Sequence, residues 1–175
     1  MANVILLTDE WHKCQLECAI REMLRNADGG AIVNNSSVYG VIGNPQLPIY
    51  VASKHAVLGL TKAAALEYAR AGVRVNAVAP GAIETEMMEQ SIGNNKEVRA
   101  ALVALHPIGR AGKPEEIANA VVWLLSDKAS FVTGHTLLVC VRTIASAYSR
   151  YCGKTCANCS VYACNNNFRS TSPLD

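Results

Sequence analysis

Charged side chains are scarce in this sequence. Asp, Glu, Lys and Arg make up 17% of its 175 residues, whereas hydrophobic residues make up 50%. An average soluble domain carries about 25% charged residues, so part of an apolar surface is expected to lie uncovered. The basic residues are scattered among acids and the formal net charge is +2, which leaves no basic stripe to follow the phosphates of a nucleic acid. We expect no nucleic-acid partner.

Long apolar runs are absent as well. No stretch reaches the roughly 18 residues that a membrane-spanning helix needs. The start, MANVILLTDE, has no positively charged segment, and its apolar run is only four residues long. We therefore expect a cytoplasmic protein with no membrane partner, and its length favours one domain with its own core.

Cysteine is distributed unevenly. Five of the seven cysteines follow residue 139, and no secretory signal accompanies them, so a disulfide framework is not expected. The composition after Val139 changes to Ser, Asn, Cys, Tyr and Arg with little periodicity. We predict that residues 140–175 form an irregular, Cys-rich and poorly ordered tail.

Part of the tail is spaced like half of a zinc site. Cys156 and Cys159 form one Cys-x-x-Cys pair, with Cys152 and Cys164 on either side, and thiolates at this spacing are common zinc ligands. A second well-spaced pair is missing. We rank a zinc-binding tail last among the possible functions and expect no metal site.

The rest of the chain alternates predicted strands and helices. Apolar periodicity, or richness in Ala, Leu and Lys without an internal proline, predicts helices at 11–27, 50–71 and 114–126, and 84–105 is loosely helical. Short apolar segments rich in β-branched residues predict strands at 31–33, 73–79 and 136–139. Strands joined by helical crossovers predict an α/β fold with a parallel sheet.

Three strands are few for a parallel sheet, which needs cover on both faces. The strand at 31–33 is therefore expected to have an unpaired edge. Such an edge is a template for pairing with another chain. The sequence thus predicts only part of a larger fold.

Tyr50 and Lys54 are four residues apart near the start of a predicted helix, so their side chains share one helix face about one turn apart. A tyrosine hydroxyl alone is a poor acid or base near neutral pH, but an ammonium group nearby stabilises the phenolate. The pair can therefore donate and accept a proton. Two ordinary surface residues are the alternative interpretation of this spacing.

The surroundings of the pair favour the chemical interpretation. Polar segments, Asn34–Ser37 and Pro80–Thr85, follow two predicted strands directly. Open α/β sheets bind their ligands at the carboxyl ends of the strands. We therefore expect the two segments to border one site.

Three motifs resemble those of the short-chain dehydrogenase/reductase family. They are Asn-x-Ser-Ser-x-x-Gly at 34–40, Tyr-Val-Ala-Ser-Lys at 50–54, and Arg-Val-Asn-Ala-Val-Ala-Pro-Gly at 74–81. Gly-Arg-x-Gly-x-Pro-Glu-Glu at 109–116 and Thr133-Gly134 extend the resemblance, which covers about 11–139. It implies a partial Rossmann-like, doubly wound parallel sheet that holds only the C-terminal strands and helices of the family fold.

The resemblance implies roles for these residues. Ser37 would hold the substrate carbonyl or hydroxyl, Tyr50 would exchange the proton, and Lys54 would tune Tyr50 and bind the ribose of an NAD or NADP cofactor that carries the hydride. The backbone of Ile83 and the hydroxyl of Thr85 would contact the nicotinamide carboxamide. The remaining cofactor-binding residues would be Pro80 and Gly81, which shape the approach.

The N-terminal side departs from the family pattern. A full member begins with a strand, a glycine-rich turn that holds the pyrophosphate, and a residue that reads the ribose. No Gly-x-x-x-Gly-x-Gly precedes Ser37, so the resemblance implies that the dinucleotide-binding half, with the adenine and pyrophosphate site, is absent. Aligning Trp11 with a frequent family tryptophan places Leu6, with Asn3 nearby, where many members carry a catalytic asparagine.

The C-terminal side departs as well, because the segment 133–139 leads into Cys-Val-Arg rather than the family's Asp-Gly-Gly. We therefore divide the chain into a divergent segment at 1–10, the C-terminal part of a Rossmann-type domain at 11–139, and the tail at 140–175. Substrate specificity in this family lies largely in the segment here at 84–112.

Two functions are expected from this resemblance. The first is an NAD(P)-dependent oxidoreductase that interconverts a small-molecule alcohol and a carbonyl, with activity impaired by truncation. The second is a catalytically inactive chain that associates with full-length family members through helices 11–27 and 50–71, which resemble the family's subunit-packing helices. Either function predicts an oligomer, formed by copies of this chain or with full-length subunits.

Overall fold

The computed structural model describes residues 3–7, 12–25, 29–93 and 95–139. The predicted tail at 140–175 lies outside these residues. Strands and helices alternate along the described chain, which confirms the α/β fold class. No helix in this part of the chain is long and apolar enough to cross a membrane.

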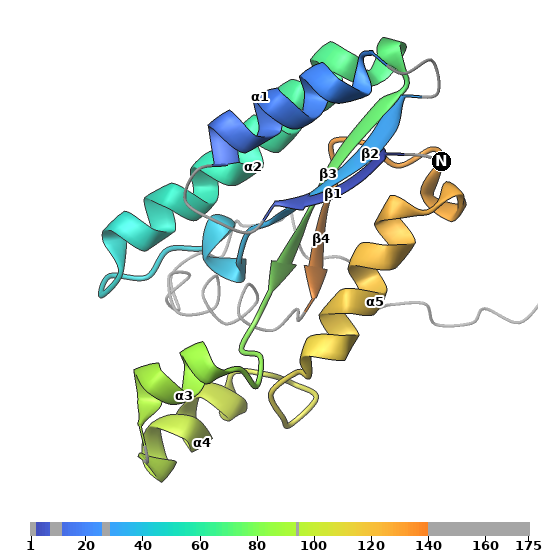
Figure 1. Ribbon diagram of the computed structural model, residues 1–175. Coiled ribbons are helices and arrows are strands. Elements are labelled where there is room, and N and C mark those ends of the chain that lie inside the picture. Colours follow the sequence, from blue (N-terminus) through green and yellow to red (C-terminus); the bar gives the residue numbers. More distant parts are fainter. Residues whose placement is uncertain (1–2, 8–11, 26–28, 94, 140–175) are drawn as a thin grey trace, which may run out of the picture.

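The described strands form one parallel sheet of four (Figure 1). Their order in the sheet is their order in the sequence, and neighbouring strands are parallel throughout. The strands are β1 (Asn3–Leu7), β2 (Gly30–Asn35), β3 (Val73–Pro80) and β4 (Thr136–Val139).

The N-terminal strand corrects one expectation. The strand at 31–33 was expected to have an unpaired edge, but β1 pairs with β2 from Asn3 opposite Gly30 to Leu7 opposite Asn34. The expected unpaired edge at 31–33 is therefore wrong. The run from Val4 to Leu7 is too short to identify a strand by periodicity, and pairing with β2 gives it this conformation.

Helices cover both faces of the sheet. Figure 1 shows α1 (His12–Met23) and α2 (Pro48–Tyr68) on one face and α5 (Pro114–Leu125) on the other. On the first face, buried side chains of α1 and α2 pack against Ile32, Val73 and Val75. On the second face, Val121 and Leu124 of α5 pack against Val33 and Val78. Alternate residues of β2 and β3 thus face opposite layers.

Local sequence signals set the ends of the long helix α2. Pro48 occupies its first turn, where proline is tolerated because no backbone N–H is needed. At the other end a short 3₁₀ turn, η2 (Ala69–Ala71), follows, and Gly72 ends it with a φ of 77°. That left-handed conformation favours glycine. Gly72 therefore ends the helical segment that begins at Pro48.

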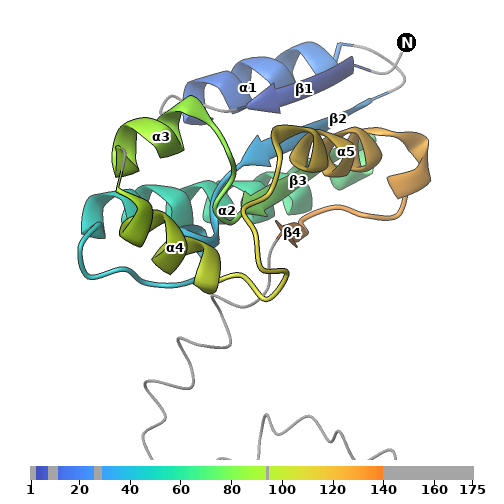
Figure 2. The same ribbon diagram turned by 90° about the horizontal axis from the view of Figure 1, so that it is seen from below.

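Two short helices lie beyond the carboxyl ends of the strands. The segment predicted to be loosely helical forms α3 (Glu86–Ile92) and α4 (Lys96–Ala104). Figure 1 shows these helices below the arrowheads of β3 and β4, and Figure 2 shows the same end of the sheet from below. Thr85 and Asn95 cap the two helices, because each side-chain oxygen accepts backbone N–H groups of the first turn.

Candidate active site at the carboxyl ends of β2 and β3

Two serines of the candidate site, Ser36 and Ser37, directly follow strand β2. Ser36 continues the sheet pairing, since its N–H donates to Val78 O at 2.9 Å, and its hydroxyl donates to Lys54 O at 3.0 Å. Ser37 comes next and is 8% exposed. Its Oγ accepts the N–H of Tyr39 at 3.2 Å, within the short turn η1 (Val38–Gly40).

Helix α2 places Tyr50 and Lys54 beside this strand end. The Lys54 Nζ lies 5.6 Å from the centroid of the Tyr50 ring and donates to Asn35 O at 3.4 Å. One ammonium group thus contacts both the tyrosine ring and the last residue of β2. The side chain of Lys54 is half-buried, whereas Tyr50 is 39% exposed.

Tyr39 adds an aromatic ring that the sequence did not identify. Its ring meets that of Tyr50 edge to face, with centroids 6.2 Å apart and planes at 78°. Because the backbone N–H of Tyr39 is bonded to Ser37, the residue bridges the serine and the tyrosine. Ser37, Tyr50 and Lys54 therefore lie in one cluster at the end of β2.

A buried hydrogen bond fixes α2 against β2. The amide of Asn34, 1% exposed, donates to Thr61 Oγ1 at 2.7 Å, and the Thr61 hydroxyl donates to Val57 O at 2.8 Å. Asn34 and Thr61 thus set how the helix that carries Tyr50 and Lys54 lies on the strand that carries Ser37.

The second expected segment, Pro80–Thr85, follows the neighbouring strand. Asn35 of β2 is opposite Val78 of β3, so the two polar segments leave adjacent strand ends. The N–H of Gly81 donates to Val139 O at 3.1 Å, which holds the start of the segment to β4.

A short parallel β-bridge determines the direction in which the backbone groups of Ile83 point. Gly112 N–H donates to Ala82 O, and Glu84 N–H donates to Gly112 O, both at 2.9 Å, so that Ile83 is paired with Gly112. In such a bridge the residues on either side of Ile83 make the bonds. The N–H and C=O of Ile83 itself therefore face away from Gly112, and its C=O accepts the Thr85 hydroxyl at 3.4 Å.

His106 is a second residue that the sequence did not identify. It is 6% exposed, and its Nε2 accepts the N–H of Ala82 at 3.0 Å. A single histidine in a loosely helical segment gives no pattern that could have pointed to this contact. The bond depends on the end of α4 approaching the segment after β3.

An ion pair fixes the turn that carries Gly112. Arg110 donates to both oxygens of Glu116, at 2.7 and 2.6 Å, and the N–H of Lys113 donates to Glu116 Oε2 at 2.7 Å. These bonds, the one from Arg110 first, lower the pKa of Glu116 from 4.5 to about 2. The carboxylate also closes the first turn of α5.

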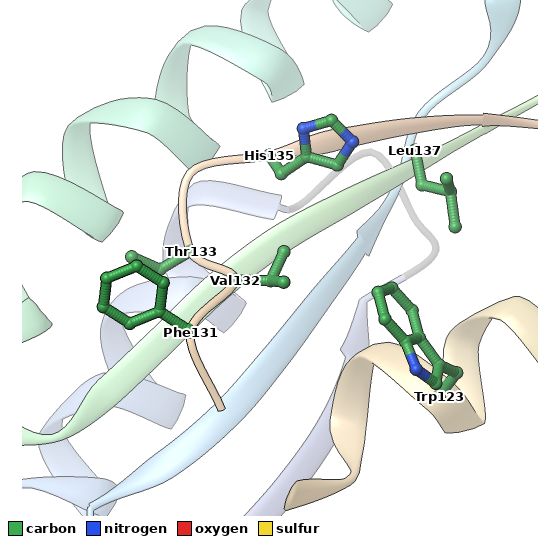
Figure 3. A pocket seen from close by; sticks show the side chains of 6 residues that line it. All are labelled: Trp123, Phe131, Val132, Thr133, His135 and Leu137. Atoms are coloured by element: carbon green, nitrogen blue, oxygen red, sulfur yellow. The ribbon is translucent and has the colours of Figure 1, made fainter. Parts of the chain in front are cut away.

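An open hollow elsewhere on the surface does not belong to this site. It measures about 390 Å³ and lies between α5 and the approach to β4 (Figure 3). Its lining is mostly apolar, and the hydroxyl of Thr133 already accepts the N–H of Val75. It borders the amino-terminal end of β4, whereas the candidate catalytic residues follow the carboxyl end of β2. The lining residues are Trp123, Phe131, Val132, Thr133, His135 and Leu137.

Within 3–7, 12–25, 29–93 and 95–139, no group of three metal-ligating side chains comes together. The cysteines of the zinc-like spacing, Cys152, Cys156, Cys159 and Cys164, lie outside the described residues.

A family model described as enoyl-(acyl carrier protein) reductase matches residues 15–141. The chain is 49% identical over 118 residues to 2,5-dichloro-2,5-cyclohexadiene-1,4-diol dehydrogenase of Sphingobium indicum, with 67% of this chain and 47% of the relative covered. It is 54% identical over 113 residues to cyclohexanol dehydrogenase of an Acinetobacter species, with 65% and 43% covered. The chain thus spans about half the length of the curated relatives it matches.

Solved structures agree with the sequence relatives. Levodione reductase superposes with a TM-score of 0.70 at 38% identity, covering 75% of this chain and 52% of that one. ElxO with NADP bound gives 0.65 at 37% identity, covering 71% and 50%. 4-hydroxyisoleucine dehydrogenase complexed with NADH gives 0.68 at 32% identity, covering 72% and 51%.

The family match covers most of the chain, residues 15–141, and the named relative and solved structure are 49% and 38% identical to it over the matched parts. The chain belongs to the short-chain dehydrogenase/reductase family.

Proposed function

We propose that this chain provides the catalytic residues of an NAD(P)-dependent oxidoreductase that interconverts an alcohol and a carbonyl. The observation that carries the proposal is the position of Lys54, whose ammonium contacts both the Tyr50 ring and the carbonyl of Asn35. A cation held there places positive charge beside the tyrosine that is proposed to exchange the proton. The named dehydrogenases and reductases among the relatives support this reaction class.

Ser37 is proposed to hold the reacting oxygen. Its Oγ already accepts the N–H of Tyr39, and a hydroxyl also carries one proton to donate. That proton is proposed to bond the substrate carbonyl or alkoxide oxygen. Low exposure of Ser37 strengthens the bond, because water competes less for the same oxygen.

Tyr50 is proposed to transfer the proton. In carbonyl reduction its hydroxyl gives the proton to the substrate oxygen, and in alcohol oxidation the phenolate takes it back. Its exposed position lets a substrate reach the hydroxyl, and the edge of the Tyr39 ring limits the motion of the Tyr50 ring.

The segment after β3 fits the nicotinamide end of NAD or NADP. Ile83 presents backbone N–H and C=O groups on the side away from Gly112, where they suit a carboxamide, and Thr85 places a hydroxyl next to them. Pro80 and Gly81 are proposed to shape the approach to these groups. Lys54 is proposed to bind the ribose, and the bound cofactor would supply or accept the hydride.

The first experiment is a fluorescence titration of the purified chain with NADH and NADPH. Lys54→Ala should weaken saturable binding, whereas Lys62→Ala, an exposed lysine on the same helix, should leave it unchanged. Tyr50→Phe should retain binding and lower turnover of a cyclic alcohol such as cyclohexanol by about 10²- to 10⁴-fold. Equal binding by the native chain and Lys54→Ala would contradict the assignment of Lys54.

The second candidate is a non-catalytic chain that associates with full-length subunits of the family. Exposed apolar side chains favour it, notably Leu66 on α2, which is 85% exposed, and Val122 on α5, which is 64% exposed. A folded chain that binds no cofactor at millimolar concentration but forms a stable complex with a full-length relative would favour this function. Sedimentation of the chain with and without that relative shows whether the complex forms.

A further inference from the structure

His106 lies two residues after α4 and makes two hydrogen bonds of different kinds. Its Nδ1 is 2.9 Å from Leu102 O, and its Nε2 is 3.0 Å from the N–H of Ala82. A carbonyl oxygen only accepts and a backbone N–H only donates, so Nδ1 carries the proton and Nε2 offers its lone pair. The two partners fix the ring as one neutral tautomer.

The Ala82 bond completes the attachment of the segment after β3. The C=O of Ala82 accepts the N–H of Gly112, and its N–H donates to His106. Both polar backbone groups of Ala82 are thus paired with the part of the chain that follows α4. Ile83, the next residue, turns its own N–H away from Gly112 in the parallel bridge that the Ala82 C=O bond helps to form.

We propose that His106 is a positioning residue, which holds Ala82 so that the backbone of Ile83 faces the nicotinamide carboxamide. The inference rests on the proposed function, because it gives His106 a part in the same cofactor site. Its physical basis is the pair of bonds on Ala82: Gly112 N–H holds its C=O, and His106 Nε2 holds its N–H. A small shift of Ala82 would change the direction of the Ile83 N–H.

His106 therefore differs from a histidine that only fills space. A space-filling role depends on the volume of the ring, whereas a positioning role depends on the acceptor at the Nε2 position. Glutamine carries its side-chain oxygen at about the distance of Nε2, and asparagine carries its oxygen and nitrogen at about the distance of Nδ1. His106→Gln therefore retains an acceptor for Ala82, and His106→Asn does not.

The hydrogen bond can be tested first in the unaltered chain by nuclear magnetic resonance. We expect His106 Nε2 to show the ¹⁵N shift of an unprotonated nitrogen and a scalar coupling to the amide nitrogen of Ala82. A protonated Nε2 without that coupling would overturn the proposal, whatever the behaviour of the variants.

The variants then test what the bond does. We expect amide exchange at Ala82 to become about three- to tenfold faster in His106→Asn, the effect of losing one hydrogen bond, and to remain near the native rate in His106→Gln. The dissociation constant for NADH should rise by a similar factor in His106→Asn and recover in His106→Gln.

The outcomes separate this inference from the proposed function. Equal Ala82 exchange and equal NADH affinity in His106→Asn and His106→Gln would overturn the positioning role while leaving the function intact. Faster Ala82 exchange in His106→Asn with no change in NADH affinity would also overturn it. A native chain that binds no NADH would overturn the proposed function and with it the cofactor role of His106, while the coupling to Ala82 would still decide the hydrogen bond itself.

Discussion

A Cβ atom placed on Gly40 would lie 2.8 Å from the carbonyl oxygen of Lys54 and 2.6 Å from Ser36 Oγ. The turn after β2 thus approaches the backbone of α2 more closely than any other residue type would allow. That approach accompanies the bond from Ser36 to Lys54 O. It sets the spacing between the strand that carries Ser37 and the helix that carries Tyr50.

Gly40→Ala should therefore separate the strand end from the helix. Overpacking against backbone typically lowers the free energy of unfolding by about 1–3 kcal/mol, and we expect a loss in this range, measured by urea denaturation. Gly43→Ala is the matched control, because a Cβ at Gly43 meets no atom within 4 Å. Equal stability of the two variants would show that the turn can move without cost.

Thr61→Val should measure how much the buried hydrogen bond between α2 and β2 contributes to the free energy of unfolding. The substitution keeps the shape of the side chain but leaves the Asn34 amide without its acceptor, at a cost of about 1–3 kcal/mol. Adding Asn34→Leu removes the unpaired amide, so the double variant should lose less stability than the sum of the two single variants. Strict additivity in a double-mutant cycle would contradict the coupling.

The lowered pKa of Glu116 predicts a pH dependence of stability. A carboxylate with a folded-state pKa of about 2, against 4.5 when unperturbed, stabilises the fold above pH 4.5 and loses that contribution as the pH falls toward 2. Glu116→Gln should unfold at a lower temperature than the native chain at pH 7, and the difference should shrink between pH 4.5 and pH 2. Glu115→Gln, an exposed neighbour in the same turn, is the control and should leave the native profile unchanged.

Replacing Arg74 with lysine should lower the stability of the fold, although the charge is kept. Its guanidinium donates to Leu124 O at 2.7 Å, Ser126 O at 3.2 Å and Leu125 O at 3.3 Å, at the carboxyl end of α5. Lysine keeps the charge but cannot present the planar fork, so Arg74→Lys should lower the free energy of unfolding by about 1–3 kcal/mol. Arg70→Lys, at an exposed position in η2, should change it by less than about 0.5 kcal/mol.

Much of the fold could be predicted because its elements carry strong local signals. The long helix over 50–71 has favourable residues throughout, and the strand over 73–79 is almost continuously apolar, so α2 and β3 were found within a few residues of their ends. Strand β1 was missed. Its conformation depends on pairing with β2, which no pattern within 3–7 can report.

The candidate site also contains residues that the sequence could identify and residues that it could not. Tyr50 and Lys54 could be chosen from their spacing, and Ser37 from the family resemblance. The structure brings the three to one strand end, although their catalytic roles stay predictions. Tyr39 and His106 could not be chosen, because their contacts join segments that only the folded sheet brings together. An aromatic contact and a ring-to-backbone bond depend on tertiary position rather than on spacing.

The sheet has the same strand order in space as along the chain. During synthesis each new strand can therefore add to the exposed side of the one before it, and no strand has to enter between two that are already paired. The cluster around Ser37 and Tyr50 can form once α2 has emerged from the ribosome. Attachment of the Ala82 segment must wait for His106 and Gly112, so the two parts of the site are expected to become ordered one after the other.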